Sequence, residues 1–193
     1  MAPARATVTV LSEALGIDPA AAPLIAEIAP SYFPGSDVPS SADDAVRELV
    51  TSLGGRFDEE TATVIGLLVQ AHEATAGLVA NTLAAYDRHG AAPVEPMLVE
   101  TLRHDPPIHY LRRVCAAPYG AYVAQTHLEL DIATANRDPE VFADPERFDP
   151  YRPDALGHLT FGAGLRPCPG RGHALAIAAG IVEAMRGSNS IAE

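Results

Sequence analysis

A long apolar segment in the middle of the chain constrains the fold most. Asp58 is a suitable N-cap, and the acidic pair Glu59 and Glu60 opens a helix that the pattern predicts from residue 59 to about residue 86. At ~1.5 Å per residue such a helix is about 40 Å long, enough to cross a whole domain. Apolar side chains lie almost all round it, which is typical of a helix buried in a core.

The middle of this predicted helix carries a polar group. Gln70, His72, Glu73 and Thr75 lie there, and burying them without partners would cost free energy. One interpretation is that these side chains are solvated or satisfied by their neighbours. The other is that they face a water-containing cavity, and both remain open.

Shorter elements accompany the long helix. We expect helices over 20–29, 41–53 and 96–104, two or three short strands between 108 and 130, a loop-rich passage over 131–160, and a final helix over 171–185. A long irregular passage in a compact domain suggests a function or an ordered cofactor site. The chain is therefore predicted to be mainly α with a small β-sheet. We expect a single domain, with residues 1–57 as a short N-terminal helical segment.

Composition excludes several classes of function. The chain has 25 acidic and 13 basic residues, a net charge of -12, which argues against a nucleic-acid partner. No run approaches the roughly 18 apolar residues that a membrane span needs, and the start does not resemble a signal peptide. Two cysteines, Cys115 and Cys168, argue against a disulfide framework. We therefore expect a cytoplasmic protein that acts neither on nucleic acid nor in a membrane.

The most informative chemistry lies in Phe161-Gly162-Ala163-Gly164-Leu165-Arg166-Pro167-Cys168-Pro169-Gly170. Two glycines two positions apart permit a tight bend. Cys168 lies between two prolines just before a helix begins, and the positive end of the helix dipole favours an ionised thiol. Arg166 adds a cation for an anionic ligand. Together these features describe a thiolate presented to a metal or an electrophile.

Cys168 could have one of four roles. An inert buried cysteine is the simplest. A zinc site lacks a second cysteine or histidine at ligand spacing. A catalytic Cys–His pair could use His158 or His173 as its base, but the loop has no obvious oxyanion arrangement. A single axial thiolate on haem iron needs only one cysteine, and it fits best.

The loop resembles the haem-binding signature of the cytochrome P-450 family, Phe-x-x-Gly-x-Arg/His-x-Cys-x-Gly, with every fixed position filled. Glu100-Thr101-Leu102-Arg103 is similar to the Glu-x-x-Arg of the family's K helix. Residues 136–149 resemble its meander segment, and the long helix resembles its I helix. The resemblance covers residues 58–186. It implies a truncated cytochrome P-450-like fold with a long I helix, K helix, meander, cysteine loop and L helix, and a haem-binding core over 58–193.

The resemblance also implies a cofactor and its contacts. The cofactor is haem b (iron protoporphyrin IX), with Cys168 as the proximal ligand of the iron. Arg113 and Arg166 match positions that hold the haem propionates, with Arg112 as the substitute for Arg113, and Phe161 packs beside the thiolate. The other implied haem contacts are Ala71, Gly162, Gly164 and Gly170.

A buried triad is implied as well. Glu100 and Arg103 would pair with Arg147 and lock the meander onto the core. Bidentate guanidinium–carboxylate contacts suit this role, and removing one partner would strand a buried charge at a cost of roughly 3–5 kcal/mol.

The chain departs from the family in its long helix. Members carry an acid followed by an alcohol there, which relays protons to bound dioxygen. This chain has Glu73 as the acid, but Ala74 stands where the alcohol should be. Thr75 comes one residue later, turned by about 100° around the helix. Glu73, Thr75 and His72 are therefore the catalytic candidates. An ordered water or a substrate hydroxyl could deliver the proton instead. A further alternative is that the dioxygen chemistry is impaired.

A second departure concerns length. Roughly the N-terminal half of a family member has no match here, so we expect an exposed haem edge that a homo-oligomer or a second protein would cover. The implied function is a monooxygenase that inserts an oxygen atom into a small organic substrate, supplied with electrons by a ferredoxin-like donor or driven by peroxide. The alternatives are a haem-carrying accessory protein without oxygenase activity and a fragment of a longer enzyme.

Overall fold

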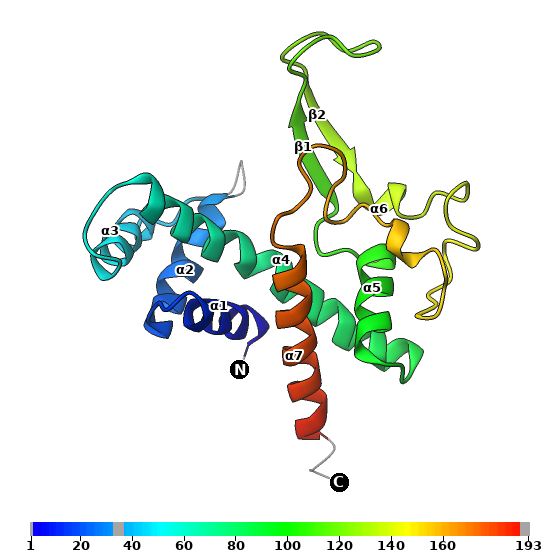
Figure 1. The fold of residues 1–193 in the computed structure, drawn as a ribbon, viewed down its shortest axis with the longest axis horizontal. Coiled ribbons are helices and arrows are strands. Elements are labelled where there is room, and N and C mark those ends of the chain that lie inside the picture. Colours follow the sequence, from blue (N-terminus) through cyan, green and yellow to red (C-terminus); the bar gives the residue numbers. More distant parts are fainter. Residues whose placement is uncertain (1, 33–36, 190–193) are drawn as a thin grey trace. The chain divides into compact units, whose positions relative to one another are not determined.

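The computed structural model, drawn in Figure 1, describes residues 2–32 and 37–189. The chain divides into two compact units. Unit 1 holds the residues up to Ala80 together with those from Gly172 onward, and unit 2 holds Asn81–Arg171. The division falls inside one long helix. The expected boundary at residue 57 is a different one and stays a prediction.

The regular elements in the described part of unit 1 are all helices. Its elements are α1 (Pro3–Ala14), η1 (Pro19–Ala21), α2 (Ala22–Ile28), η2 (Ala29–Tyr32), α3 (Ala42–Ser52), most of α4 (Glu59–His89) and α7 (Arg171–Asn189) from its second residue. Ile25 of α2, Leu49 of α3 and Leu68 of α4 are fully buried in one hydrophobic cluster. The apolar sides of these three helices therefore form the core of the unit.

Helix α4 begins where the sequence predicts and runs on to His89. The backbone N–H of Thr61 donates to Asp58 Oδ1 at 2.9 Å, a bond that caps the helix and lowers the pKa of Asp58.

The burial of α4 differs from the expectation. By length and composition the helix could cross a membrane, a test that the core helix of a soluble protein also passes. The expected absence of a membrane partner stays a prediction. Only 39% of the apolar window is buried, and Leu67 remains 44% exposed. A helix buried on all sides is therefore the wrong description for the residues that the structure covers.

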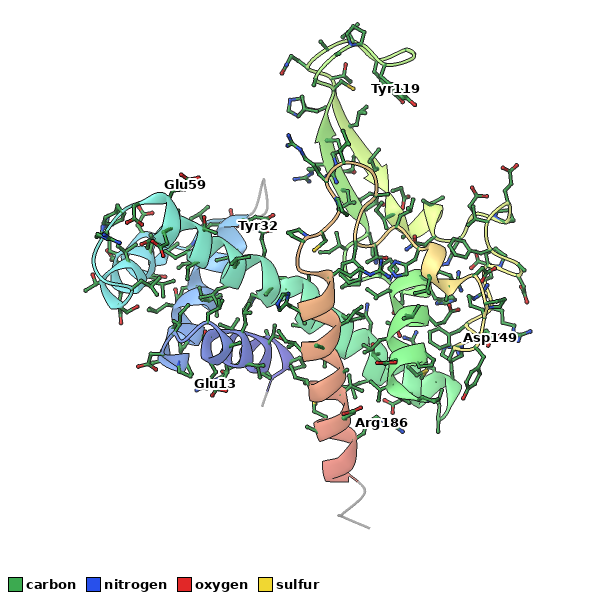
Figure 2. All side chains as sticks on the ribbon, viewed as in Figure 1. Glu13, Tyr32, Glu59, Tyr119, Asp149 and Arg186 are labelled. Carbon is green, nitrogen blue, oxygen red and sulfur yellow. The ribbon has the colours of Figure 1, made fainter. Side chains whose placement is uncertain are left out.

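Unit 2 contains the end of α4, then α5 (Val94–His104), β1 (Tyr110–Val114), β2 (His127–Asp131), α6 (Ile132–Ala135) and η3 (Ala155–Gly157). The two strands are antiparallel, with Tyr110 opposite Asp131. Their hairpin extends away from α5 in Figure 1, and Figure 2 shows Tyr119 at its outer end. Tyr119 and Tyr122 form an isolated bridge there. The predicted mainly helical fold with a small sheet is confirmed, and the sheet has two strands in the described residues.

Helix α5 supplies the buried charges of unit 2. It begins at Val94, two residues before the predicted start, because Pro96 is tolerated in a first turn whose N–H groups have no helical partner. Its buried side carries Glu100 and Arg103 among apolar residues. The passage after α6 is irregular apart from η3, as expected, and leads back to the cysteine-containing loop.

Candidate functional site

Residues 161–170 form an irregular loop in unit 2, which we call the cysteine loop. Its bend depends on Gly162 and Gly164, whose φ angles of 70° and 78° lie in the left-handed region that favours glycine. The backbone N–H of Cys168 donates to the carbonyl oxygen of Phe161 at 2.7 Å and closes the loop on itself. The predicted tight bend is confirmed.

The thiol of Cys168 is free and its side chain is exposed. A Cβ at Gly170 would lie 3.9 Å from the Cys168 sulfur, so the glycine keeps that side of the thiol open. Leu165 is fully exposed on the same loop. Among the described residues no three His, Cys, Asp or Glu side chains gather at a metal-binding distance. The donor set is thus one sulfur beside apolar surface, which fits a group that needs a single axial ligand.

Positive charge surrounds the cysteine loop. The Arg113 Nη2 nitrogen would lie 3.7 Å from a Cβ placed on Gly162. The guanidinium of Arg171 lies 5.5 Å from the centre of the Phe161 ring, a cation–π contact. Arg166 is exposed on the loop itself. These cations favour an anionic ligand at the loop, and the haem contacts expected of Arg113, Arg166 and Phe161 stay predictions.

A fully buried ion pair anchors the segments behind the loop. Arg103 donates to both carboxylate oxygens of Glu100, with its Nε at 2.9 Å and its Nη2 at 2.7 Å. Its remaining N–H groups donate to the carbonyl oxygens of Asn136, Pro145 and Arg147 at 3.0, 2.8 and 3.2 Å. All five N–H donors of the guanidinium are therefore satisfied, as a buried charge requires. The predicted pairing of Glu100 with Arg103 is confirmed.

The third member of the triad is Arg152, and the prediction of Arg147 is wrong. The Nε of Arg152 donates to Glu100 at 3.0 Å, and this pairing outweighs the cost of burial and raises the pKa of Arg152. Arg147 turns its carbonyl oxygen toward the cluster, whereas its side chain is 65% exposed and pairs with Asp149 at 2.7 Å. The path of the irregular backbone decides which arginine enters the core.

A buried asparagine ties α5 to the irregular segment that enters the cysteine loop. The Asn136 amide nitrogen donates to the carbonyl of Leu102 at 3.2 Å and to the hydroxyl of Thr160 at 2.9 Å. Its amide oxygen accepts the backbone N–H of Leu159 at 2.7 Å. The Thr160 hydroxyl donates to the same Leu102 carbonyl at 2.5 Å, so two side chains hold the loop that presents Cys168 to α5.

His158 is buried at the entrance to the cysteine loop. Its Nδ1 accepts the backbone N–H of Thr160 at 3.3 Å, and its Nε2 has no hydrogen-bond partner among residues 2–32 and 37–189. Burial, assisted by the positive charge of Arg171, lowers the pKa of His158 to about 4. The ring is therefore neutral at neutral pH, and it makes no hydrogen bond to Cys168, so a Cys168–His158 catalytic pair is not formed.

The predicted catalytic candidates lie on the unit 1 part of α4. His72 is buried and its Nδ1 lies 2.9 Å from Oε1 of the half-exposed Glu73. Thr75 is only 3% exposed, whereas Ala71 and Ala74 are half-buried. For His72 this contact supports the interpretation that neighbours satisfy the polar group. The catalytic roles of His72, Glu73 and Thr75, and the haem contact of Ala71, stay predictions.

The structure adds residues that the motifs do not single out. Arg152, Asn136 and Thr160 hold the cysteine loop and the meander to α5. The sequence signal for Arg152 is its position, since it is a second arginine only five residues after Arg147. Nothing in the local pattern separates a buried asparagine from an exposed one in an irregular segment.

Comparison with known proteins points to one family. The sequence profile of the cytochrome P-450 family matches residues 94–179. The chain is 38% identical over 139 residues to the protein DesVIII of Streptomyces venezuelae, which covers 62% of this chain and 32% of DesVIII. It is 32% identical over 145 residues to the cyclomarin C epoxidase CymV of Salinispora arenicola, which covers 66% of this chain and 36% of CymV. The chain spans about a third of the length of these curated relatives.

Solved structures share the fold. The structure of CYP164A2 from Mycobacterium smegmatis with econazole bound is similar at a TM-score of 0.75 and 24% identity, over 93% of this chain and 57% of that one. CalO2 is similar at a TM-score of 0.80 and 19% identity, over 95% of this chain and 57% of that one. Both units therefore have counterparts within one longer known fold.

Proposed function

Because this chain belongs to the cytochrome P-450 family, we propose that it binds haem through Cys168 and acts as a haem-thiolate monooxygenase on a small organic substrate. Haem, iron protoporphyrin IX, is the prosthetic group of that family. The observation that carries the proposal is the free, exposed thiol of Cys168 on a loop closed by its own backbone N–H.

The residues of the cysteine loop fit this prosthetic group. The Cys168 sulfur would ligate the iron, and the absence of a side chain at Gly170 leaves the sulfur accessible. Arg113 and Arg166 would bind the propionates, because two guanidinium groups beside the loop suit two carboxylates. The bound group supplies, through its thiolate-ligated iron, the chemistry that cleaves the O–O bond.

We propose that His72 and Glu73 of α4 take part in proton transfer. Glu73 Oε1 and His72 Nδ1 are within hydrogen-bond distance at 2.9 Å, so a proton can be held between them. Glu73 is half-exposed and can exchange this proton with solvent. Ala74 has no hydroxyl to pass it on, which leaves Thr75, water or a substrate hydroxyl for that step.

The partners of the proposed enzyme follow from the same reasoning. We propose a cytoplasmic protein that takes electrons from a ferredoxin-like donor or uses peroxide. Large apolar side chains on its surface, among them Phe57 at 77% and Tyr119 at 76% exposure, favour association with a second copy or another protein. Size-exclusion chromatography with light scattering measures that association.

The test of the activity is oxygen incorporation. The haem-loaded protein is supplied with apolar test compounds and either a ferredoxin system with ¹⁸O-labelled dioxygen or labelled peroxide. We expect products that gain one labelled oxygen atom. Loaded protein that oxidises none of the compounds by either route contradicts the monooxygenase proposal.

A second candidate is a haem-carrying accessory protein without oxygenase activity. The observation that favours it is Ala74, since the side chain that completes the proton path in family members is replaced by a methyl group. This candidate predicts haem binding together with no oxidation of any test compound.

A further inference from the structure

Two histidines hold a phenylalanine where α4 and α5 end in unit 2. The ring of His89, the last residue of α4, stacks on the ring of Phe148 with the ring centres 4.3 Å apart and the planes 9° from parallel. The ring of His104, the last residue of α5, meets Phe148 edge-on at 5.5 Å. We call His89, His104 and Phe148 the imidazole clasp, and within it Phe148 is half-buried.

One hydrogen bond fastens the clasp to the backbone beside Phe148. The Nε2 of His104 lies 3.0 Å from the carbonyl oxygen of Glu146, so this nitrogen carries the hydrogen and donates it. In the neutral ring Nδ1 is then the unprotonated nitrogen, and the next proton binds there. The Glu146 bond does not oppose that proton, so the cost of charging His104 comes from the surroundings of the ring.

Positive charge is fixed around the His104 ring. Arg103 on the same helix and Arg137 of the irregular passage both oppose a charge on it. All five N–H donors of Arg103 are bound, and Arg137 donates to the backbone carbonyl of His104 itself. Neither guanidinium can therefore turn away from the ring without losing hydrogen bonds.

The carboxylates around the clasp are already paired with arginines. The pairs are Glu100 with Arg103 and Arg152, Glu146 with Arg137, and Asp105 with Arg88 of α4. His89 adds a second titratable ring, with its centre 6.5 Å from that of His104. Burial, reinforced by the charges of Arg137 and Arg103, lowers the pKa of His104. The charged ring is thus more stable in water than in the clasp.

We propose that His104 is a latch released by acid: the neutral ring holds Glu146 and Phe148 against the ends of α4 and α5, and the protonated ring swings into water and leaves Phe148 exposed. The buried bonds from Arg103 to the neighbouring carbonyl oxygens keep the flanking backbone in place, so the change is confined to the clasp. The latch needs no haem, and acidity thereby controls how much apolar surface this part of unit 2 presents to water.

Fluorine NMR of the full-length chain labelled with 4-fluorophenylalanine tests the latch. The Phe148 signal is identified by its loss in Phe148→Leu, and its shift between H₂O and D₂O measures the exposure of the ring. We expect this exposure to rise between pH 7.5 and pH 5 in the wild type. A released histidine titrates near pH 6.5, so linkage limits the gain in the released population at pH 5 to about thirtyfold.

His104→Gln removes the titrating group and keeps an N–H donor for Glu146, so the exposure of Phe148 should not change with pH in this variant. His127→Gln is the matched control, because His127 is an exposed histidine of β2, and it should respond as the wild type does. If His104→Gln fails to fold, His104→Phe keeps a ring against Phe148 without a titrating group and should be equally insensitive to pH.

Two results would overturn the latch. One is an exposure of Phe148 that stays constant with pH in the wild type. The other is a rise in His104→Gln, or in His104→Phe where that variant decides, as large as in the wild type. Neither result bears on haem binding by Cys168, which is measured separately.

Discussion

Arg152 Nε donates to Glu100 Oε1 at 3.0 Å, although the two residues are 52 positions apart. The same oxygen accepts Arg103 Nη2 at 2.7 Å and the backbone N–H of Asp149 at 2.9 Å. One buried carboxylate thus holds two guanidinium groups and a backbone turn. It joins α5 to the irregular segment that precedes the cysteine loop.

This arrangement predicts unequal effects for the two arginines of that segment. Arg152→Met leaves Glu100 with one partner fewer in the core, and we expect a loss of about 3 kcal/mol in the free energy of unfolding. Arg147→Met removes only an exposed pair with Asp149, for which we expect about 0–1 kcal/mol. Urea unfolding measures both. Equal losses would contradict the assignment of Arg152 to the triad.

Replacement of Asn136 tests how the cysteine loop is held. In Asn136→Leu the backbone N–H of Leu159 loses its partner, whereas the hydroxyl of Thr160 keeps its bond to the carbonyl oxygen of Leu102. An unsatisfied buried group costs about 1–3 kcal/mol, so we expect a loss of roughly 2 kcal/mol in the free energy of unfolding. Haem release should also become faster, since the segment that enters the loop loses one of its two hydrogen-bonded links to α5. A loss below about 1 kcal/mol would count against this account.

His158 predicts a specific dependence of stability on pH. Its pKa is about 4 in the folded protein and near 6.5 in the unfolded chain. Between these values the unfolded chain binds more protons, so the contribution of His158 is complete above about pH 6.5 and is lost as the pH falls toward 4, by roughly 3 kcal/mol. His158→Asn keeps an acceptor for Thr160 and should flatten the dependence.

Urea unfolding at pH 7 and at pH 4.5 measures this effect. His127→Asn is the control, because His127 is exposed on β2 and its loss should leave the wild-type dependence unchanged. A His158→Asn protein that loses as much stability as wild type between the two pH values would show that another group is responsible.

Ala74 predicts a gain of function in the proposed monooxygenase. Ala74→Thr restores an alcohol directly after Glu73, and a positioned proton donor supports proton transfer in the reaction. We expect a severalfold rise in product formed per NADH consumed. Ala74→Val has the same shape without the hydroxyl and should give no rise. Equal coupling in the two variants would place the proton path elsewhere.

Local patterns account for much of the fold and for part of the site. Asp58 caps α4 because a carboxylate before a helical run accepts the first free N–H groups. Gly162 and Gly164 bend the cysteine loop because few other residues adopt positive φ. In both cases the cause lies within a few residues along the chain.

Contacts between distant segments are what the sequence leaves open. Arg147 and Arg152 occupy the same irregular segment, and only the course of its turns sends one side chain inward and the other outward. Asn136 and Thr160 meet across 24 positions. The pairing of β1 with β2 likewise depends on the strand register, which joins residues that no local motif connects.

The central claim is that Cys168 ligates haem iron, and the carbon monoxide spectrum tests it most directly. Haem-loaded protein is reduced, exposed to carbon monoxide and recorded beside Cys168→Ser and the conservative control Cys115→Ser. We expect a strongly red-shifted Soret band for the wild type and for Cys115→Ser, and its loss in Cys168→Ser with the helical content retained. A red-shifted band that persists in Cys168→Ser, or wild-type protein that binds no haem, would contradict the account.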